Sequence, residues 1–581
     1  MTAFLGVSAS VTGRRWVGLS ENDDRLAQAI AQQTGLPATL SRTLARLGVA
    51  ATDASAYLTP SLRDLMPDPS IFRDMDTAAE RIMQAITKRQ TIAIFADYDV
   101  DGGSSAALLI DYLRQFSIPA TLYVPDRIDE GYGPNEPAMA DLASRHDLII
   151  CVDCGTLSHD AIAAAKDADV IVLDHHMGGE TLPPALAVVN PNRQDEDNDF
   201  GNLCAAGVVF LTLVAVNRNL RAAGQTEPNL IALLDLVALA TVADVAPLTG
   251  LNRALVRQGL KVMTRRDRVG LAALSDAARL TSAPNSYHLG FALGPRINAG
   301  GRIGKADLGA RLLATTDPHE AQAMADQLSQ LNDDRRDIET QVRLQAMEQA
   351  EERGFNAPLV WAAGNGWHPG VVGIVASRLK EASNRPAIVI GLDGAEGKGS
   401  GRSVTGIDLG SAIATCTHEG LLLKGGGHKM AAGLTVATDK LEEAMARLSE
   451  LLQKQGADKI GPKDLMLDGS VMPSAITTDL IEQLEMAGPF GAGAPAPRFA
   501  LPAQKIAFAK RAGESHLRLT AQDANGGRID AICFGAYDGP IGPMLENHKG
   551  QSFHLAGRLE IDEWGGRRKA KLRLEDVALA E

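Results

Sequence analysis

Three short apolar runs, each followed by an acidic residue, constrain the fold of this chain more than any other feature. The runs cover residues 91–95, 148–152 and 170–173, and the acids that follow them are Asp97, Asp153 and Asp174. Alanine-rich stretches of helical character separate the runs. Buried strands that alternate with helices form a parallel α/β sheet. Ligands bind such a sheet beyond the carboxyl ends of its strands, where these acids lie.

The length of the chain predicts several domains, because 581 residues is roughly four times the usual ~150 for one domain. Asp317-Pro318 and Gly354 predict the start and the end of one long helix, which spans about 54 Å at 1.5 Å per residue. We expect a helical lead-in over 1–75, a parallel-sheet domain over 76–316, a connecting helix over 317–354, a second α/β domain over 355–462 and a small β-barrel over 463–581.

Composition narrows the classes of protein that fit this chain. The net charge of 57 − 71 = −14 argues against nucleic-acid binding through bulk positive charge, although it leaves room for a local basic cleft. Five cysteines make no disulfide framework and suggest a reducing compartment. No signal peptide or membrane span is evident in the sequence. We therefore expect a soluble, cytoplasmic protein that does not bind membranes.

The segment Asp97-Tyr98-Asp99-Val100-Asp101-Gly102 is the most informative motif. It matches the opening of a calcium EF-hand, but position twelve of that loop is Leu108 instead of glutamate, and a strand precedes it instead of a helix. Three carboxylates directly after a buried strand repel one another unless a cation compensates their charge. The motif therefore predicts metal binding rather than a solvated acidic loop.

Further candidate ligands follow later strands and a long apolar segment. They are Asp153, the run Asp174-His175-His176, and Asp244. Carboxylates with one or two imidazoles suit Mn²⁺ or Mg²⁺ better than a thiolate-bound Zn²⁺. More than four such ligands indicate two ions about 3.5–4 Å apart, an arrangement that can clamp both the attacking and the leaving oxygen of a phosphoryl transfer. Cys151 and Cys154 form a lone CxxC pair, which we interpret as structural and reduced.

These motifs resemble those of the DHH phosphoesterase superfamily. The resemblance rests on residues 97–102, 152–155, 174–176 and 243–244, and residues 425–433 resemble the DHH-associated domain. Residues 294–302 and 367–373, with the barrel-like tail, narrow it to the bacterial single-strand-specific 5′→3′ DNA exonucleases. It extends from about residue 37 to the C-terminus. It implies a two-lobed α/β fold, in which a DHH domain and a DHH-associated domain are joined by the long helix, followed by a barrel of the OB type.

The resemblance also implies roles for single residues. The metal ligands would be Asp99, Asp101, Asp153, His175 and Asp244. Asp153 would bridge both ions. Smaller members of the superfamily have a histidine where this chain has Phe95, so Asp97 or water would complete the first site. His176 would face the scissile phosphate and assist the leaving oxygen, and Asp174 would orient its neighbours.

Substrate contacts are expected in three glycine-rich segments. The candidate residues are Arg296, Asn298, Arg302, Arg402, Ser403, Gly426, Gly427 and His428. The arginines could grip phosphates or form salt bridges with local acids, and the glycines could cradle anions, cap helices or allow close packing. In the tail, Trp564 precedes the basic run 567–571, which could bind single strands or protect a solvated edge strand.

The function implied is metal-dependent 5′→3′ degradation of single-stranded DNA to 5′-mononucleotides by two-metal hydrolysis, in repair and recombination. The resemblance implies a monomer that uses Mn²⁺ or Mg²⁺, with a single-strand-binding protein and a helicase as partners. Two alternatives remain open on the same motifs: a phosphodiesterase for short oligonucleotides or cyclic dinucleotides, and a DNA-binding scaffold without catalysis.

Overall fold

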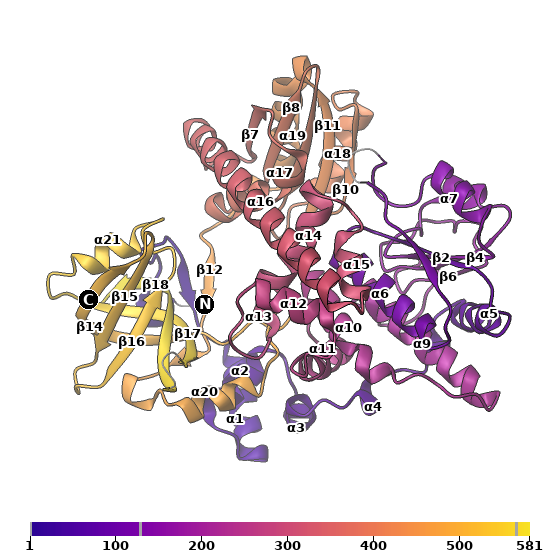
Figure 1. The fold of residues 1–581 in the computed structure, drawn as a ribbon. Coiled ribbons are helices and arrows are strands. Elements are labelled where there is room, and N and C mark those ends of the chain that lie inside the picture. The colour runs from indigo at the N-terminus through magenta and orange to yellow at the C-terminus, as the bar shows by residue number, and fades with distance from the viewer. Residues whose placement is uncertain (1–2, 127–129, 564–566, 581) are drawn as a thin grey trace. The chain divides into compact units, whose positions relative to one another are not determined.

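The structure is a computed structural model that describes residues 3–126, 130–563 and 567–580. The chain divides into two compact units (Figure 1). The first comprises Met1–Pro295, Gly309–Gln322 and Lys463–Glu581, and the second comprises Arg296–Leu308 and Ala323–Pro462. The first unit contains a parallel sheet, a barrel and several apolar clusters, and the second unit contains one mixed sheet with its own apolar clusters.

The first unit is built on a five-stranded parallel sheet, as the apolar runs predict. Its strands, in spatial order, are β3 (Ala120–Tyr123), β2 (Ile92–Ala96), β4 (Leu148–Val152), β5 (Asp169–Leu173) and β6 (Ala187–Val189). The chain places β3 on one side of β2 and then crosses to place β4 on the other. The order of the strands therefore reverses between β2 and β4, and the crevice at such a reversal is where ligands bind open α/β sheets.

Helices cover both faces of this sheet, which explains why β2 and β4 are apolar throughout. One face shares a core with α7 (Glu136–Ala143) and α8 (His159–Ala164). Helices α5 (Met75–Thr87), α6 (Val100–Arg114) and α9 (Ala205–Ala222) pack on strands of the sheet and on one another. The remaining helices of this region are α10 (Leu234–Ala243), α11 (Gly250–Met263), α12 (Val269–Ala277), α13 (Ser286–His288) and α15 (Leu308–Ala314).

The C-terminal part of the first unit is a closed five-stranded barrel, which confirms the expected OB-type fold. Its strands are β14 (Phe499–Ala512), β15 (His516–Gln522), β16 (Arg528–Cys533), β17 (Ser552–Asp562) and β18 (Lys569–Leu579). They pair in the order β14-β15-β16-β18-β17, and β17 pairs with β14 to close the ring. Helices α20 (Thr478–Glu485) and α21 (Ile541–Glu546) and the short strand β13 (Gly469–Ser470) accompany the barrel.

The N-terminal lead-in belongs to the same core as this barrel. It contains β1 (Arg15–Val17), α1 (Glu21–Thr34), α2 (Ala38–Arg46), α3 (Ala54–Leu58) and α4 (Leu62–Leu65). Strand β1 pairs with β12 (Asp464–Met466), and Leu44 shares an apolar cluster with Phe499 of β14. The buried carboxylate of Asp576 accepts a hydrogen bond of 2.9 Å from the indole of Trp16. The two ends of the chain are therefore folded together.

The second unit is an α/β domain with a mixed five-stranded sheet. Its strands, in spatial order, are β10 (Lys424–Gly427), β11 (Ala431–Ala437), β9 (Glu396–Arg402), β8 (Ala387–Asp393) and β7 (Val360–Asn365). Helices α18 (Leu409–His418) and α19 (Leu441–Lys454) share a core with one set of strand residues. Helix α17 (Pro369–Ser383) and the long α16 (Pro318–Arg353) share another. Helix α14 (Gly294–Ile303) precedes α16 in the chain.

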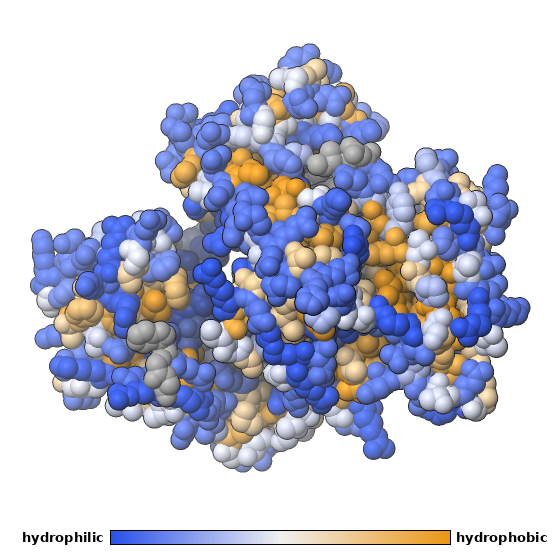
Figure 2. All heavy atoms as spheres, in the orientation of Figure 1, coloured by the Kyte–Doolittle hydropathy of each residue, from blue (hydrophilic) through white to orange (hydrophobic). Residues whose placement is uncertain are grey.

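The sequence predicts this architecture correctly in outline. It also predicts the first and the last residue of α16. In the described part of the chain, no helix is long and apolar enough to cross a membrane. The surface in view is largely hydrophilic, and apolar residues gather over the parallel sheet and on the barrel (Figure 2). The division of the chain at residues 75, 316, 354 and 462 stays a prediction.

Candidate active site

Three acids follow directly on the carboxyl ends of neighbouring parallel strands. Asp97 follows β2, Asp153 follows β4 and Asp174 follows β5, and all three are buried. The backbone N–H of Asp153 donates to the Leu173 carbonyl, which holds the residue at the sheet edge although its φ of 60° is unusual for a non-glycine residue. Such backbone strain is common at functional sites.

Asp99 and Asp101 are positioned by the start of α6. The Asp99 carboxylate caps the helix by accepting hydrogen bonds from the backbone N–H groups of Asp101 (2.8 Å) and Gly102 (3.1 Å). Asp101 is buried, and its carboxylate accepts from the backbone N–H groups of Ala205 (2.6 Å) and Ala206 (2.8 Å) at the start of α9. Two helix starts therefore fix these carboxylates, and both favour negative charge.

The glycine of this motif is required by close packing. A Cβ atom added at Gly102 would lie 2.4 Å from the backbone oxygen of Asp97. Any other residue would push the turn after β2 away from the start of α6. Gly102 therefore allows Asp97, Asp99 and Asp101 to lie within one tight turn.

His175 lies among the acids that these different elements supply. Its Nε2 atom is 3.2 Å from Oδ1 of Asp153 and 3.7 Å from Oδ2 of Asp101, and its Nδ1 atom is 3.9 Å from Oδ2 of Asp244. Asp244 caps the C-terminus of α10, so this acid comes from a helix end rather than a strand end. The structure thus brings residues that are far apart in the sequence, from Asp97 to Asp244, to one place.

The acids and histidines form three overlapping groups in which the candidate ligand atoms lie within 4.8 Å of one another. These groups are Asp97–Asp99–Asp153, Asp101–His175–Asp244 and Asp153–His175–His176. Burial and the charges of the neighbouring acids raise the pKa of Asp153 well above its ordinary value and raise the pKa of Asp244 to about 8. Buried carboxylates that repel one another need a cation. The oxygen-rich donor set therefore fits Mn²⁺ or Mg²⁺.

Asp174 supports this cluster rather than joining it. Its carboxylate accepts hydrogen bonds from the Thr156 hydroxyl (2.7 Å) and the backbone N–H groups of Thr156, His175 and His176. It also lies 2.8 Å from Nδ1 of His176. Burial alone would raise the pKa of Asp174, but these hydrogen bonds hold it below its ordinary value. For His176 the directions are opposite: burial alone would lower the pKa of the imidazole, but the hydrogen bond and the charge of Asp174 raise this pKa to about 9.

Tyr132 completes the site and is absent from our sequence-based candidates. Its hydroxyl donates to the Asp153 carbonyl at 3.0 Å and lies 3.2 Å from Nδ1 and 3.3 Å from Nε2 of His176. Its ring meets the His176 ring edge-on, with centroids 5.6 Å apart. Gly131 and Gly133, both with positive φ, flank it. The run Gly-Tyr-Gly before the Asp153 strand is the signal that could have identified this residue.

Two asparagines that the sequence analysis also missed hold the histidine loop. The Asn190 amide donates to the Thr156 hydroxyl (2.9 Å) and to the His176 carbonyl (2.8 Å). The Asn192 amide donates to the His175 carbonyl (2.6 Å). Both follow β6, the next strand of the sheet. The expectation that functional residues follow the carboxyl ends of the strands, which identified the acids, therefore applies to these asparagines as well.

The predicted substrate residues all belong to the second unit, and their local structure corrects our expectation of glycine-rich loops. Helix α14 carries Arg296, Asn298 and Arg302, so this segment is not a loop. Its glycine allows close packing instead, because a Cβ atom at Gly300 would lie 3.2 Å from Leu328. Nε of Arg296 donates to the Ser329 hydroxyl (3.2 Å), and Arg302 donates to the Gly370 carbonyl (2.9 Å). These two arginines therefore already brace α14 against its neighbours.

The two other glycine-rich segments are strands and not phosphate loops. Residues 396–402 form β9 inside the sheet, so their backbone N–H groups are used by β8 and β11. A Cβ atom at Gly401 would lie 2.6 Å from Leu409, so close packing explains this glycine. Ser403 is buried and its hydroxyl donates to the Ile407 carbonyl, so its contact with a substrate stays a prediction.

Two other predicted substrate residues, Arg402 and His428, lie near each other at one end of this sheet. Arg402 pairs in register with Ala431, whose carbonyl accepts from the backbone N–H of His428. Gly426 and Gly427 lie in the edge strand β10, directly before His428.

In the barrel, Trp564 lies outside the described residues, and the role of the basic run 567–571 stays a prediction. Arg568 of that run pairs with Glu482 and Glu563.

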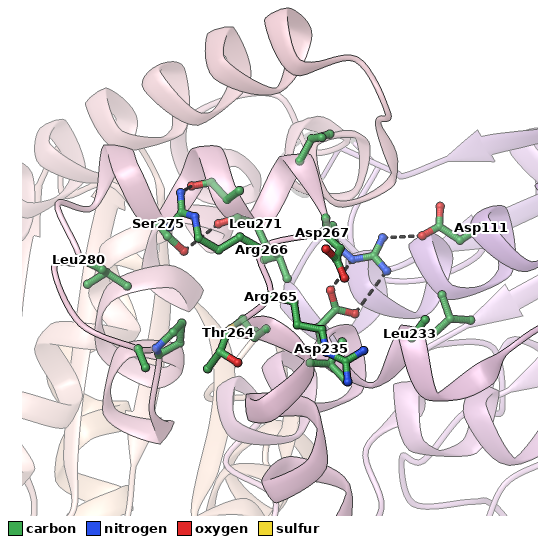
Figure 3. Close-up of a pocket in the computed structure, with 18 of the residues that line it drawn as sticks. Asp111, Leu233, Asp235, Thr264, Arg265, Arg266, Asp267, Leu271, Ser275 and Leu280 are labelled. Carbon is green, nitrogen blue, oxygen red and sulfur yellow. Dashed lines mark hydrogen bonds and ion pairs between the residues drawn. The ribbon is translucent and has the colours of Figure 1, made fainter.

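A separate cavity of about 660 Å³ lies in the first unit (Figure 3). None of the candidate metal ligands lines it. The largely buried guanidinium of Arg268 contacts Asp111 of α6 and lies 2.7 Å from Asp235 of α10, and both acids are labelled in Figure 3. This ion triad joins the two helices whose ends carry Asp99, Asp101 and Asp244, so it positions the acidic cluster from a distance.

Comparisons with known proteins agree with this architecture. Family models match in three places: the N-terminal domain of the DHH family over residues 91–241, the DHHA1 domain over 356–454 and the RecJ OB domain over 467–576. The first and third regions lie in the first unit and the second lies in the second unit.

Individual relatives extend the similarity over most of the chain. The single-stranded-DNA-specific exonuclease RecJ of Dickeya dadantii is 38% identical, over 93% of this chain and 96% of the relative. Its Escherichia coli counterpart is 34% identical over the same shares. The crystal structure of RecJ in complex with Mn²⁺ from Thermus thermophilus matches with a TM-score of 0.80 and 28% identity, covering 97% of this chain and 80% of that one. With these matches and its cluster of carboxylates and histidines, the chain belongs to the RecJ family of single-stranded-DNA-specific exonucleases.

Proposed function

We propose that this chain hydrolyses single-stranded DNA from its 5′ end, releases 5′-mononucleotides and uses two Mn²⁺ or Mg²⁺ ions. One observation carries the proposal: a buried cluster of carboxylates around His175 lies at the strand-order reversal of the parallel sheet. The members of this cluster come from several different elements, and the acids repel one another. Such a cluster is costly to fold unless it binds metal.

The acids of the cluster would divide between two ions. Asp153 belongs to two of the three candidate groups, which supports it as the bridging ligand. Asp97 and Asp99 would hold one side of the site, and Asp101, His175 and Asp244 the other. When bound, the two ions would activate water and balance the negative charge that develops on the phosphate.

His176 and its partners would handle the proton of the leaving group. Asp174 orients the imidazole through Nδ1, so Nε2, which also lies 3.3 Å from the Tyr132 hydroxyl, is the nitrogen that would turn toward the substrate. Asp174 also keeps the imidazole protonated near neutral pH, since it raises the pKa of His176 to about 9. The Tyr132 hydroxyl would contact the same ring at the edge between its two nitrogens, since it lies 3.2 Å from Nδ1 and 3.3 Å from Nε2. His176 would therefore act as a general acid toward the departing oxygen.

Residues of the second unit would hold the DNA backbone. Arg402, His428, Gly426 and Gly427 are the proposed phosphate contacts, with Arg296, Asn298 and Arg302 of α14 as further candidates. Arginine can bind phosphate through two parallel hydrogen bonds. The barrel would bind the strand beyond the cleaved end, as OB folds bind single strands by stacking and charge. The presence of a barrel of the OB type favours a polymer over a dinucleotide as the substrate.

The test uses single-stranded DNA labelled at either its 5′ or its 3′ end, with Mn²⁺ or with a chelator. We expect metal-dependent release of labelled mononucleotide from the 5′ label first, and loss of this activity in Asp153→Ala. Cleavage of dinucleotides while long DNA stays intact would move the function to small substrates. DNA binding without any cleavage would support a scaffold.

The cellular setting is also part of the proposal. We infer a monomeric, cytoplasmic enzyme of DNA repair and recombination that cooperates with a helicase and a single-strand-binding protein. The names of the RecJ relatives give the same substrate, single-stranded DNA, which supports a role in DNA processing. Gel filtration of the purified chain and co-purification from cells test the oligomeric state and the partners.

A further inference from the structure

Three loops of the first unit supply most of the polar lining of the cavity drawn in Figure 3. The first loop is the turn 264–268 between α11 and α12, which contributes five consecutive lining residues (Figure 3). The second is the segment 280–284 between α12 and α13, and the third is the pair 315–316 after α15. The volume of about 660 Å³ is within the range of roughly 300–1,000 Å³ for small-molecule sites. The cavity therefore has room for one small ligand.

Arginines give this cavity a positive charge. Four arginines and three aspartates line it, so it has a local excess of one positive charge in a chain whose net charge is −14. Three of the arginines already hold the walls, because Arg114, Arg266 and Arg268 each form an ion pair with an aspartate. The fourth, Arg265, is exposed, and within the described part of the chain its guanidinium forms no hydrogen bond or ion pair. A ligand can therefore engage Arg265 without breaking a contact.

A carboxylate and several hydroxyls line the cavity together with Arg265. Asp267 lies two residues further along the same turn (Figure 3). Among the residues that the structure describes, it forms no ion pair with Arg265 or with any other cation. The hydroxyls of Thr281, Ser282 and Thr316 have no hydrogen-bond partner among those residues either. One cavity thus offers a cation, an anion and three hydroxyls to a ligand.

The inner wall of the cavity is apolar. Val262, Met263 and Leu271 line it and are buried, with 5%, 5% and 3% of their surface exposed. Leu280 and Pro284 of the second loop line it and are half-buried. An apolar or flat group that covers this wall is removed from water, which stabilises its binding.

We propose that this cavity binds a free nucleoside 5′-phosphate at a site separate from the metal centre. The base would lie against the apolar inner wall. Arg265 and the hydroxyls would hold the phosphate, since arginine binds a phosphate through two parallel hydrogen bonds. Asp267 would accept a hydrogen bond from the sugar hydroxyl or from an amino group of the base. A ligand of this class satisfies the cation, the anion and the apolar wall at once.

Smaller parts of such a ligand fit the cavity less well. Inorganic phosphate uses Arg265 but leaves Asp267 and the apolar wall without a partner. A nucleoside covers the wall but leaves Arg265 without an anion. The cavity therefore selects for a molecule that carries a phosphate, a sugar and a base together.

The cavity also reaches the two helices that carry candidate metal ligands. Asp111 lies near the end of α6, and Asp101 lies at its start, ten residues or about 15 Å away. Asp235 lies at the start of α10, and Asp244 follows the end of that helix. A nucleotide in the cavity thus contacts one end of each helix while the metal centre uses the other end. Binding at the two places is therefore expected to be coupled.

Isothermal titration calorimetry with 2′-deoxyadenosine 5′-phosphate in chelator tests the site, because no metal ion then binds the phosphate. We expect one molecule to bind per chain. Arg265→Ala should weaken binding about tenfold to a hundredfold, the effect of lost hydrogen bonds to a charged group. Leu280→Ala should weaken it about threefold to tenfold, because less apolar surface is covered. Deoxyadenosine and inorganic phosphate should each bind at least about tenfold more weakly than the nucleotide.

Two controls make the result specific to the cavity. Arg63→Ala removes an exposed arginine of the same unit that does not line the cavity, and it should bind the nucleotide like the wild type. Arg265→Lys keeps the charge but loses the two parallel hydrogen bonds, so its affinity should lie between those of the wild type and Arg265→Ala. The thermal midpoint of each variant checks that it is folded.

Two outcomes would overturn the proposal. The first is equal affinity of the wild type and Arg265→Ala for the nucleotide, which includes the absence of binding by both. The second is displacement of the nucleotide by a 5′-phosphorylated thymidine 20-mer, which would assign the cavity to the end of a strand instead of a free nucleotide.

A second measurement rests on the proposed function and tests the coupling. During hydrolysis of single-stranded DNA with Mn²⁺, nucleotide at the metal centre competes with DNA and raises KM, whereas nucleotide in the cavity changes kcat through α6 and α10. Arg265→Ala should lose the effect on kcat and keep the effect on KM. An effect on kcat that persists in Arg265→Ala would overturn the coupling. If calorimetry shows the site but the chain never cleaves DNA, the proposed hydrolysis fails while the nucleotide site stands.

Discussion

The Nδ1 atom of His176 lies 2.8 Å from Oδ1 of Asp174, and Oδ2 of the same carboxylate accepts the Thr156 hydroxyl. This arrangement fixes the imidazole and stabilises its protonated form. Asp174 is buried and fully engaged in hydrogen bonds, so it acts on the reaction through the residues it holds, and His176 is the one whose side chain it contacts directly at a ring nitrogen.

Replacing Asp174 with asparagine should therefore lower kcat much more than it changes KM. The amide carries no charge, so the pKa of His176 falls and the general acid is lost near neutral pH. We expect a decrease in kcat of about 100-fold or more, the usual size of a general-acid contribution. The measurement is steady-state hydrolysis of single-stranded DNA. Thr156→Ser keeps the hydroxyl and should behave like the wild type; an Asp174→Asn enzyme of normal kcat would contradict this role.

Metal removal should make the stability of the protein depend strongly on pH. The pKa of Asp244 is raised to about 8 in the folded protein, whereas an unfolded aspartate titrates near 3.8, and the pKa of His176 is raised to about 9. The metal-free folded state thus holds extra protons, and its stability falls as pH rises from about 4 through 9. Asp174 stays ionised over this range.

Thermal melts in chelator at pH values of about 5, 6.5 and 8 check this prediction, because they span the range between the unfolded and folded pKa values. The midpoint should fall with rising pH, and Mn²⁺ should restore it most at the highest pH, where the acids are ionised and bind metal best. Asp244→Asn should flatten the pH dependence in chelator. A metal-free midpoint that rises with pH over this range would contradict the raised pKa values.

Tyr132 should contribute to the rate through its hydroxyl and to substrate binding through its ring. Tyr132→Phe removes the hydrogen bonds to Asp153 and His176, and we expect kcat to fall about threefold to tenfold, the effect of one lost hydrogen bond. Tyr132→Ala should also raise KM, because the ring is 55% exposed at the site. The two variants are compared in one set of kinetics. Equal behaviour of Tyr132→Phe and the wild type would refute the role of the hydroxyl.

Arg268 should be critical for stability although it lies outside the metal centre. Arg268→Ala leaves the buried carboxylate of Asp235 without its ion-pair partner, whereas Asp111 keeps its pair with Arg114, and this loss costs about 3–5 kcal/mol of unfolding free energy. Arg266→Ala removes an exposed pair with Asp276 and should cost about 0–1 kcal/mol. Urea unfolding of both variants decides between these values. A similar, small loss in both would mean that the triad does not hold α6 and α10 together.

The sequence predicted the parts of the site that follow strand ends. Asp97, Asp153 and the run from Asp174 to His176 could be found because an apolar run and an acid are adjacent in the chain. Asp244 was found by motif, yet its place at the end of α10 was not evident, because a buried helix and a buried strand are equally apolar. Tyr132 was missed because its role depends on a contact across 44 residues with His176.

Glycine-rich segments were the main source of error. The run 397–401 predicted an anion-binding loop, but the structure has the central strand β9, where glycines make room for Ile390, Leu434 and Leu409. The run around Gly300 predicted a loop and forms helix α14 instead. Glycine permits many backbone conformations, so neighbouring side chains rather than the local sequence decide between them.

A titration with Mn²⁺, followed by electron paramagnetic resonance and by hydrolysis of single-stranded DNA in the same samples, tests two-metal catalysis by this site. We expect two tightly bound, magnetically coupled ions per wild-type chain and activity that rises as the second ion binds. Asp153→Asn should lose the coupling and the activity together. Full hydrolysis by the metal-free chain, or two coupled ions in Asp153→Asn, would contradict a two-metal site bridged by Asp153.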